Sequence, residues 1–173
     1  MSTRKSSRQE ETADAIELLT ADHNEVDEMF ETYQDLVDGD ADGDAKATLA
    51  EQICDALTVH ATIEEEIFYP AARLALEEED LLDEAEVEHA SVKDLIAQIR
   101  EMEPDEELYD AKVKVLGEYV KHHVEEEEGE MFQQLRDTDF DAEAIGERLL
   151  ARKEELMAEA GMVEEESEES EEA

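Results

Sequence analysis

Residues 60–70 read HATIEEEIFYP, in which a histidine is followed four positions later by a glutamate and then by an apolar, aromatic end. Residues 122–132, HHVEEEEGEMF, repeat this order with His123 and Glu127. Positions i and i+4 lie on one face of an α-helix, so each stretch can present an imidazole and a carboxylate side by side. The repeat therefore predicts two similar helices, each with a His–Glu pair on one face.

The rest of the chain has the spacing of a helical protein. Two prolines and six glycines stand among 173 residues, and apolar residues recur at intervals of three and four. We expect four long helices, at about 13–37, 45–76, 81–102 and 104–137. Thr12 should cap the first helix, Pro70 should only kink the second, and Pro104 should begin the fourth. Short connections between these helices predict an all-α, up-down-up-down four-helix bundle.

The domain boundaries that we expect follow from local composition. Residues 1–11 are polar and locally basic and form a leader that is predicted to be disordered, and residues 12–137 form the four-helix bundle. Residues 138–160 predict an additional C-terminal helix that stops at Gly161. Residues 161–173 are rich in glutamate and carry too little apolar surface to fold, which predicts a disordered acidic tail.

The chain is strongly acidic. It holds 55 acidic and 14 basic residues, for a formal net charge of −41. Self-repulsion on this scale opposes folding and decreases when salt screens it, so the composition indicates adaptation to a halophilic cytoplasm. A chaperone or cation buffer with an acidic surface is the alternative interpretation. Nucleic acid is not an expected partner, because phosphate binding needs basic patches.

Targeting and redox signals favour the cytoplasm. No run of about twenty apolar residues is present, so we expect neither a transmembrane helix nor a membrane partner. The start of the chain lacks the apolar core of a secretion signal. Cys54 is the single cysteine and cannot form an internal disulfide, which fits a reducing compartment. We interpret it as a buried, inert thiol.

The histidines carry the chemical signal. Acids make up about a third of the chain, so a histidine followed four positions later by an acid is weak evidence by itself, and His122 with Glu126 also has this spacing. The apolar stripes are stronger evidence, because each of the four helices places one histidine on its stripe, and two stripes add a glutamate. An unpaired carboxylate is costly to bury, so a metal cluster explains the set better than separate core histidines do. The residues concerned are His23, His60, Glu64, His89, His123 and Glu127.

Four segments, LLTADHNEV, HATIEEEIFYP, EVEHASVKDLI and HHVEEEEGEMF, resemble in their order the four blocks of the hemerythrin family in its HHE cation-binding form. The resemblance covers about residues 14–136. It implies a four-helix bundle with a non-haem di-iron centre of two iron ions, in which Glu64 and Glu127 bridge the metals. It also implies terminal ligands at His23, His60, His89 and His123. Imidazole and carboxylate ligands suit manganese or zinc as well.

The sequence departs from the family at three places. Oxygen-carrying hemerythrins have a further histidine where this chain has Lys93, and an ammonium group is no ligand, so reversible oxygen carriage is in doubt. The last block offers His122 and His123, of which alignment and the apolar stripe favour His123. His122 is then a partner of a ligand, a supplementary ligand or a solvent-facing residue. Gln133 replaces a frequent proline, which is a minor change.

Three functions remain open. Six protein ligands cannot fill the roughly twelve positions of two six-coordinate metals, so dioxygen, nitric oxide or peroxide could bind. We expect a protein that binds or senses such a ligand or handles iron, rather than an enzyme. A di-iron enzyme that reduces peroxide or oxygen and a metal-free acidic interaction protein are the alternatives. The aromatic residues near the stripes are expected to shield the centre or simply to pack in the core: Phe30, Phe68, Tyr69 and Phe132.

The sequence does not indicate whether the protein is a monomer or an oligomer.

Overall fold

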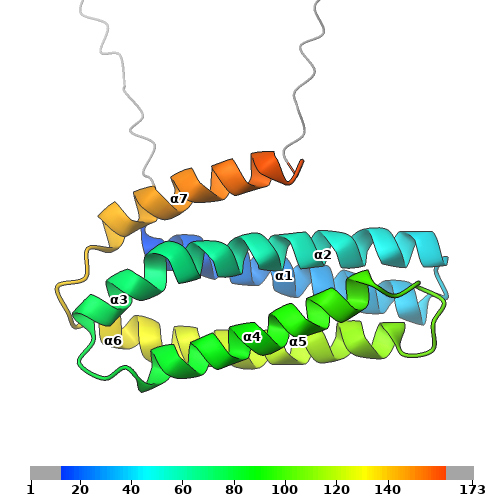
Figure 1. Ribbon diagram of the computed structural model, residues 1–173, viewed down its shortest axis with the longest axis horizontal. Coiled ribbons are helices and arrows are strands. Elements are labelled where there is room, and N and C mark those ends of the chain that lie inside the picture. The colour runs from blue at the N-terminus through cyan, green and yellow to red at the C-terminus, as the bar shows by residue number, and fades with distance from the viewer. Residues whose placement is uncertain (1–12, 163–173) are drawn as a thin grey trace, which may run out of the picture.

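The structure is a computed structural model that describes residues 13–162 (Figure 1). The predicted leader, the proposed cap Thr12 and most of the predicted tail lie outside these residues. Within them, every regular element is helical. The elements are α1 (Ala15–Asp38), α2 (Gly43–Ile63), η1 (Glu64–Phe68), α3 (Tyr69–Ala75), α4 (Asp80–Arg100), α5 (Tyr109–Glu126), η2 (Glu127–Met131), α6 (Phe132–Arg136) and α7 (Ala142–Glu159).

The elements combine into four long rods. The segments α2, η1 and α3 follow one another without a break, as do α5, η2 and α6. The first rod, α1, packs against α2 and α5, and α4 packs against the same two helices. Figure 1 shows the rods running alternately in opposite directions along the long axis. The predicted all-α, up-down-up-down bundle is confirmed.

Two predicted helix starts are wrong. The first helix begins at Ala15, because the Asp14 side chain accepts a hydrogen bond from the Glu17 N–H (2.9 Å) and the Glu17 carboxylate accepts one from the Asp14 N–H (3.1 Å). This reciprocal cap satisfies two N-terminal donors, so Asp14 and not Thr12 is the cap. Pro104 does not begin a helix. It lies in the loop before Tyr109.

Both rods that carry a His–Glu pair contain a π-helical turn that begins at the glutamate, Glu64 in η1 and Glu127 in η2. A π-turn adds a residue to the helical repeat and changes which later residues face the core. Phe68 is therefore fully buried and Tyr69 almost so, whereas Ile67 is only partly buried. At regular helical spacing Ile67 would follow Glu64 on the apolar stripe, and the π-turn leaves it only partly buried at the core. Pro70 lies just after the turn and does not end the rod.

The hydrophobic core has two parts, and the four stripe histidines lie between them. One part includes Leu19, Phe68 and Phe132, and the other includes Val26, Ile53 and Val92. On α1, Leu19 and Val26 flank His23 in sequence, so the helix passes from one cluster to the other through the histidine layer.

Cys54 lies in the second part of the core and is buried. Burial raises the pKa of its thiol to about 11, and nearby Glu51 and Asp55 act in the same direction against the charge of Arg100. The expected buried thiol is confirmed, and at neutral pH the group stays protonated and poorly nucleophilic.

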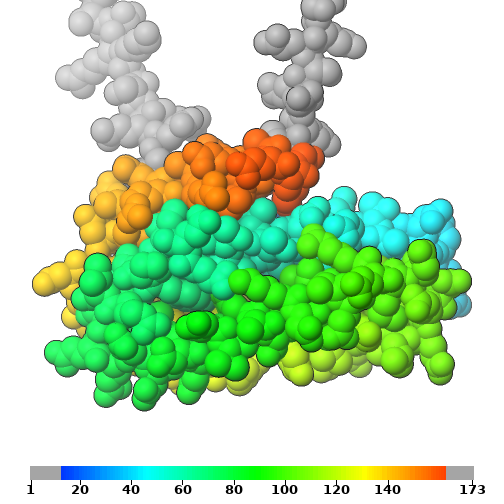
Figure 2. Space-filling view, in the orientation of Figure 1, coloured from blue at the N-terminus to red at the C-terminus, as the bar shows by residue number. Residues whose placement is uncertain are grey.

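The additional helix α7 crosses the bundle over α1, α2 and η1 (Figures 1 and 2). It comes very close to the start of α1, since a Cβ atom at Gly146 would lie 2.7 Å from the Ala13 carbonyl oxygen and 2.8 Å from the Ala15 nitrogen. Glycine is the residue that permits this approach. No helix within residues 13–162 is both long enough and apolar enough to cross a membrane.

Candidate metal centre

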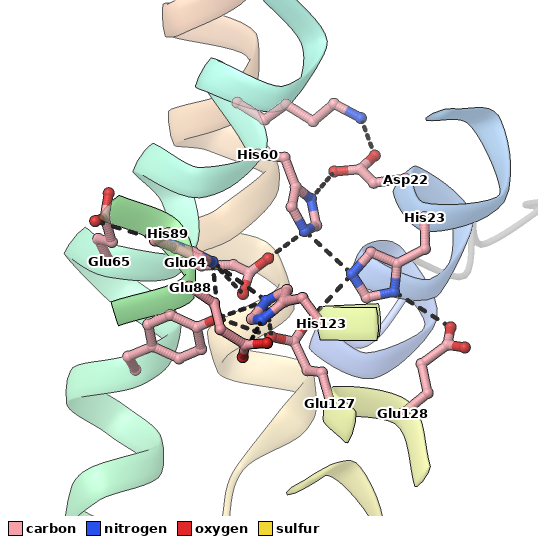
Figure 3. A network of polar contacts seen from close by, with 12 residues as sticks. Asp22, His23, His60, Glu64, Glu65, Glu88, His89, His123, Glu127 and Glu128 are labelled. Atoms are coloured by element: carbon pink, nitrogen blue, oxygen red, sulfur yellow. Dashed lines mark hydrogen bonds and ion pairs between the residues drawn. The ribbon is translucent and has the colours of Figure 1, made fainter. Parts of the chain in front are cut away.

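The six residues that the sequence singles out meet at the middle of the bundle (Figure 3). All are buried: the carboxylates are 0 % and 1 % exposed, and the imidazoles 5–8 %. They come from four different rods, one histidine from each, because each helix presents its apolar stripe to the same axis. The set consists of His23, His60, Glu64, His89, His123 and Glu127.

The first half-site is the pair His23 and His60 with its carboxylates. Ligand-type atoms of these histidines and of Glu64 and Glu127 all lie within 4.8 Å of one another. The two Nε2 atoms are 3.1 Å apart. His23 Nε2 is 3.3 Å from Glu127 Oε1, and His60 Nε2 is in direct contact with Glu64 Oε1.

The second half-site is the pair His89 and His123, whose Nε2 atoms are 3.2 Å apart. His123 Nε2 lies 3.1 Å from Glu127 Oε2, and His89 Nε2 lies 3.9 Å from Glu64 Oε2. Each of the two glutamates therefore directs one oxygen to each half-site. This is the arrangement that two bridging carboxylates require.

The donor set fits a metal because its buried oxygens are poorly satisfied by protein groups. Apart from the histidine contacts given above, no donor among the described residues reaches either oxygen of Glu64 or Oε1 of Glu127. A buried carboxylate without donors is costly, and a cation would offset that cost. Burial and the nearby charge of Glu127 raise the pKa of Glu64, whereas the contacts from His123 and His23 overcome burial and hold the pKa of Glu127 well below its usual range.

The histidines differ in charge state in the metal-free chain. Burial opposes protonation of His60 and His123, but their carboxylate neighbours outweigh it and raise each pKa to about 10. The opposite holds for His89, because burial and the charge of His123 lower its pKa to about 3. The chain without metal thus holds two imidazoles of raised pKa and one of lowered pKa in the same cluster.

Carboxylates outside the cluster fix the orientation of three rings. Asp22 Oδ2 lies 3.0 Å from His60 Nδ1, and Glu88 Oε1 lies 3.1 Å from His123 Nδ1. Glu128 Oε1 lies 3.2 Å from His23 Nδ1. Such contacts at Nδ1 leave Nε2 free to face the centre and increase the basicity of a ligand. Sequence reasoning missed these residues, although an acid immediately before His23 and before His89 was a visible signal.

Lys93 does not approach the centre. Its ammonium group donates to both oxygens of Glu65, at 2.6 and 2.7 Å, on the exposed side of the bundle. Glu65 Oε1 remains 3.8 Å from His89 Nδ1, which has no hydrogen-bond partner among the described residues. Lys93 thus pairs with a carboxylate that lies near His89 Nδ1 without a hydrogen bond to it.

Tyr69 is a residue whose polar role the sequence did not indicate. Its hydroxyl donates a hydrogen bond to Glu127 Oε2 at 2.7 Å and lies 3.1 Å from His89 Nε2 and 3.2 Å from His123 Nε2. Burial and the charges of Glu127 and Glu64 raise the pKa of the phenol well above its ordinary value. The π-turn in η1 explains the position, because it turns Tyr69 inward from the register of a regular helix.

His122 lies outside the central cluster. Its side chain is 64 % exposed, and its Nε2 atom is 3.2 Å from Glu126 Oε1 and 3.7 Å from Glu88 Oε2. Of the other aromatic residues, Phe132 stacks on His23 with 6.2 Å between ring centroids, whereas Phe30 packs against Gly117 and is only partly buried.

A cavity of about 30 Å³ adjoins the four histidines on the side of the second core cluster. A single water needs about 10–15 Å³ of such space, so the cavity holds about two small molecules. Most of its remaining wall is aliphatic: Val26, Leu57, Ala61, Val92, Val120 and Val124. The centre therefore has an apolar space for a very small ligand.

Comparisons with known proteins agree with this geometry. Residues 14–135 match the hemerythrin HHE cation binding domain. A hemerythrin HHE cation binding domain-containing protein from Mycobacterium kansasii has a similar fold, with a TM-score of 0.71 and 22% identity over 87% of this chain and 91% of that chain. A protein of Nostoc sp. named DNA nickase is 31% identical over 120 residues, which are 69% of this chain and 33% of the relative. The chain thus matches about a third of that relative's length. With its six buried ligand-type residues and a family match over most of its length, the chain belongs to the hemerythrin HHE cation-binding family.

Proposed function

We propose that the chain is a non-haem di-iron protein that binds dioxygen or nitric oxide, as a sensor of the gas or in the handling of iron and oxidative stress. The observation that carries the proposal is the sharing of Glu64 and Glu127, each with one oxygen directed to each half-site. His23 and His60 would hold one ion, and His89 and His123 the other.

Iron fits the donor set because imidazole and carboxylate ligands suit it, and they suit manganese and zinc as well. When bound, iron supplies open coordination positions and a one-electron redox couple for a small oxidant. The chain itself holds the ligands in register, and the carboxylates at Nδ1 keep the rings oriented. The buried aliphatic wall limits access of water.

The ligand class follows from the size and polarity of the adjoining cavity. About 30 Å³ is enough for a molecule of two to four atoms and too little for an organic substrate. Dioxygen, nitric oxide and peroxide meet this limit. The aliphatic side chains of Val26, Val92 and Val120 favour the uncharged diatomic gases over ions.

Anaerobic reconstitution with Fe²⁺ tests the proposal. We expect about two iron ions per chain, on the stoichiometry that two half-sites imply, and a new near-ultraviolet charge-transfer band when oxygen is admitted. A His60→Ala variant should retain much less iron. Retention of one ion or none by the wild type, or equal retention by His60→Ala, would contradict the dinuclear centre.

Peroxide reduction is the second candidate function, and Tyr69 is the observation that favours it. Its hydroxyl, protonated at neutral pH, donates to Glu127 Oε2 and would donate to peroxide beside the second half-site after turning from that acceptor. Catalytic turnover of peroxide by the wild type and a fall of at least tenfold in Tyr69→Phe would support this function. Stoichiometric, reversible gas binding with no turnover would exclude it.

The cytoplasm is the proposed location, on the strength of the buried, unpaired Cys54 and the acidic composition. We propose no nucleic-acid partner for this chain, because a net charge of −41 repels phosphates. The activity named for the Nostoc relative is that of a protein about three times as long as the matched region.

A further inference from the structure

We propose that Glu88, His122 and Glu126, here called the outer cluster, form a third metal site at the surface of the bundle. This site captures a divalent transition-metal cation such as Fe²⁺ and passes it inward to the second half-site. The transfer step rests on the proposed dinuclear centre, whereas the binding step does not.

The geometry of the outer cluster suits one ion. His122 and Glu126 lie one helical turn apart on α5, and Glu88 reaches them from α4. His122 Nε2 is 3.2 Å from Glu126 Oε1 and 3.7 Å from Glu88 Oε2, and ligand atoms of all three lie within 4.8 Å of one another. Ligands on one ion with bonds of about 2.1 Å lie about 3–4 Å apart, so small side-chain adjustments complete the site.

The chemistry of the outer cluster suits temporary binding. One imidazole and two carboxylates favour Fe²⁺, Mn²⁺ or Zn²⁺ over alkali and alkaline-earth ions, which prefer oxygen ligands alone. The exposed imidazole is directly accessible to a hydrated ion from solvent. Three protein ligands leave several water molecules on the ion, so it binds more weakly than in the buried centre and can leave again.

Glu88 connects the outer cluster to the second half-site. Its Oε1 atom lies 3.1 Å from Nδ1 of His123, while its Oε2 atom faces His122 (Figure 3 shows Glu88 beside His123). Two residues of the outer cluster, Glu88 and Glu126, and two of the centre, His123 and Glu127, line one crevice of about 10 Å³, together with Leu81, Ala85 and Met131. This space admits about one water molecule or ion. Glu127 of the centre thus lines the same small crevice as two ligands of the outer cluster.

The first half-site offers a comparison for the second oxygen of Glu88. There Asp22 holds the Nδ1 atom of His60 as Glu88 holds that of His123, and its other oxygen accepts a hydrogen bond from the Lys153 ammonium group. The second oxygen of the orienting carboxylate thus pairs with a cation in the first half-site. In the second half-site it faces ligand-type side chains instead. The spacing of His122 and Glu126 is common in a chain rich in acids. Glu88 distinguishes this cluster, because it reaches them from α4 and contacts His123 with its other oxygen.

Loading kinetics test the transfer step in three forms of the full chain: wild type, His122→Gln and the matched control Glu125→Gln, an exposed acid of α5 outside the cluster. Each is mixed anaerobically with micromolar Fe²⁺ in about 1 M salt, which screens diffuse attraction to the acidic surface. A strong chelator then removes loosely held iron at set times, and retained iron is counted. We expect His122→Gln to load about tenfold more slowly than the control and to reach the same final count. Loading of His122→Gln at the control rate would overturn the transfer step.

Zinc titration followed by NMR tests the binding step separately. The His122 ring signals of the wild type should shift on addition of Zn²⁺, and the number of ions bound at saturation should be three per chain, against two in His122→Gln. Unchanged His122 signals up to a threefold excess of Zn²⁺ would overturn the third site. If the wild type retains no iron against the chelator while the His122 signals shift, the dinuclear centre fails and the outer site stands.

Discussion

The two half-sites share one plan and differ in their surroundings. In both, the acid that precedes a stripe histidine orients the ring of the paired histidine, Asp22 for His60 and Glu88 for His123. In both, a π-turn begins at the shared glutamate. The sequence repeat thus extends to the hydrogen bonds around the ligands and not only to the ligands themselves.

The differences lie one layer further out. An aromatic residue stands five residues after each shared glutamate and lies against a histidine ring. Phe132 stacks on His23 of the first half-site, and the ring centroid of Tyr69 lies 5.3 Å from that of His89 in the second. The tyrosine hydroxyl gives the second half-site a hydrogen-bond donor at a place where the first has only carbon. The helix α7 contacts the first half-site through Lys153, whose ammonium group donates a hydrogen bond to Asp22 Oδ1.

The two halves of the duplicated His–Glu set thus have unequal surroundings. In the first half-site the orienting carboxylate of Asp22 pairs with Lys153 of α7. The second combines a phenol, a histidine held neutral and an open outer cluster. We therefore expect the metal on the second side to exchange and react, and the metal on the first side to stay.

Removal of a shared carboxylate should have the largest effect, because it acts on both half-sites at once. Glu127→Gln removes the negative charge that both half-sites share and replaces one of the two carboxylate oxygens by an NH2 group, which is no ligand. We expect metal retention to fall from about two ions per chain to almost none. Elemental analysis after gel filtration measures this, and circular dichroism controls for folding. Retention of a single ion would show instead that the half-sites bind independently.

Metal affinity should rise with pH. In the metal-free chain His60 and His123 have pKa values of about 10, so both are protonated at pH 7, and a metal ion must displace one proton from each. His89, with its pKa lowered to about 3, contributes none. Between pH 6.5 and 8.5 the affinity of each half-site should rise about tenfold per pH unit. Calorimetry in buffers of different ionisation enthalpy counts the protons, and a pH-independent affinity would refute the assignment.

Loss of an orienting carboxylate should lower the metal affinity of one half-site and not of the other. Asp22→Ala removes the partner of His60 Nδ1 and leaves the Glu88–His123 contact intact. We expect about 10–100-fold weaker binding of one of the two ions and little change for the other. A two-step Co²⁺ titration resolves them. Equal weakening of both steps would mean that the shared glutamates couple the half-sites completely.

Tyr69→Phe should make the two half-sites more alike. The substitution removes the hydroxyl that contacts His89, His123 and Glu127 and keeps the ring packing. We expect both ions to bind with affinities within about tenfold of the wild type and the optical spectrum of the oxidised protein to change. An unchanged spectrum would show that the phenol does not touch the metal environment. Phe132→Leu, which removes the ring on the other side, is the matched comparison.

Lys153→Ala should have the smallest effect. Lys153 of α7 forms an ion pair with Asp22, the residue that orients His60. Partly solvated ion pairs contribute about 1 kcal/mol or less to the free energy of unfolding. We expect a fall of a few degrees in Tm of the metal-free protein. Lys114→Ala, at an exposed site on α5, serves as control. An equal fall in both variants would indicate that only overall charge matters.

Sequence reasoning identified more of the ligands than of their environment. The histidines and glutamates lie on apolar stripes with helical spacing, and that spacing survives folding because local backbone geometry fixes it. Predictions from the sequence were wrong where one local contact or turn overrides the helical spacing. The Asp14–Glu17 cap displaced the predicted start at Thr12, and the π-turn at Glu64 turned Tyr69 inward in place of Ile67.

By itself, the sequence determined the helices and the repeated His–Glu pairs, because both follow from periodicity along each helix. Short connections predicted the bundle, and the family resemblance together with the apolar stripe favoured His123 over His122. Only the tertiary structure decided which groups from different helices meet. The pairing of Asp22 with Lys153, the diversion of Glu65 by Lys93 and the contact of Glu88 with both His122 and His123 are examples. The physical reason is that helical spacing specifies a face, whereas distances between faces depend on how the rods pack and on side chains that no local rule relates.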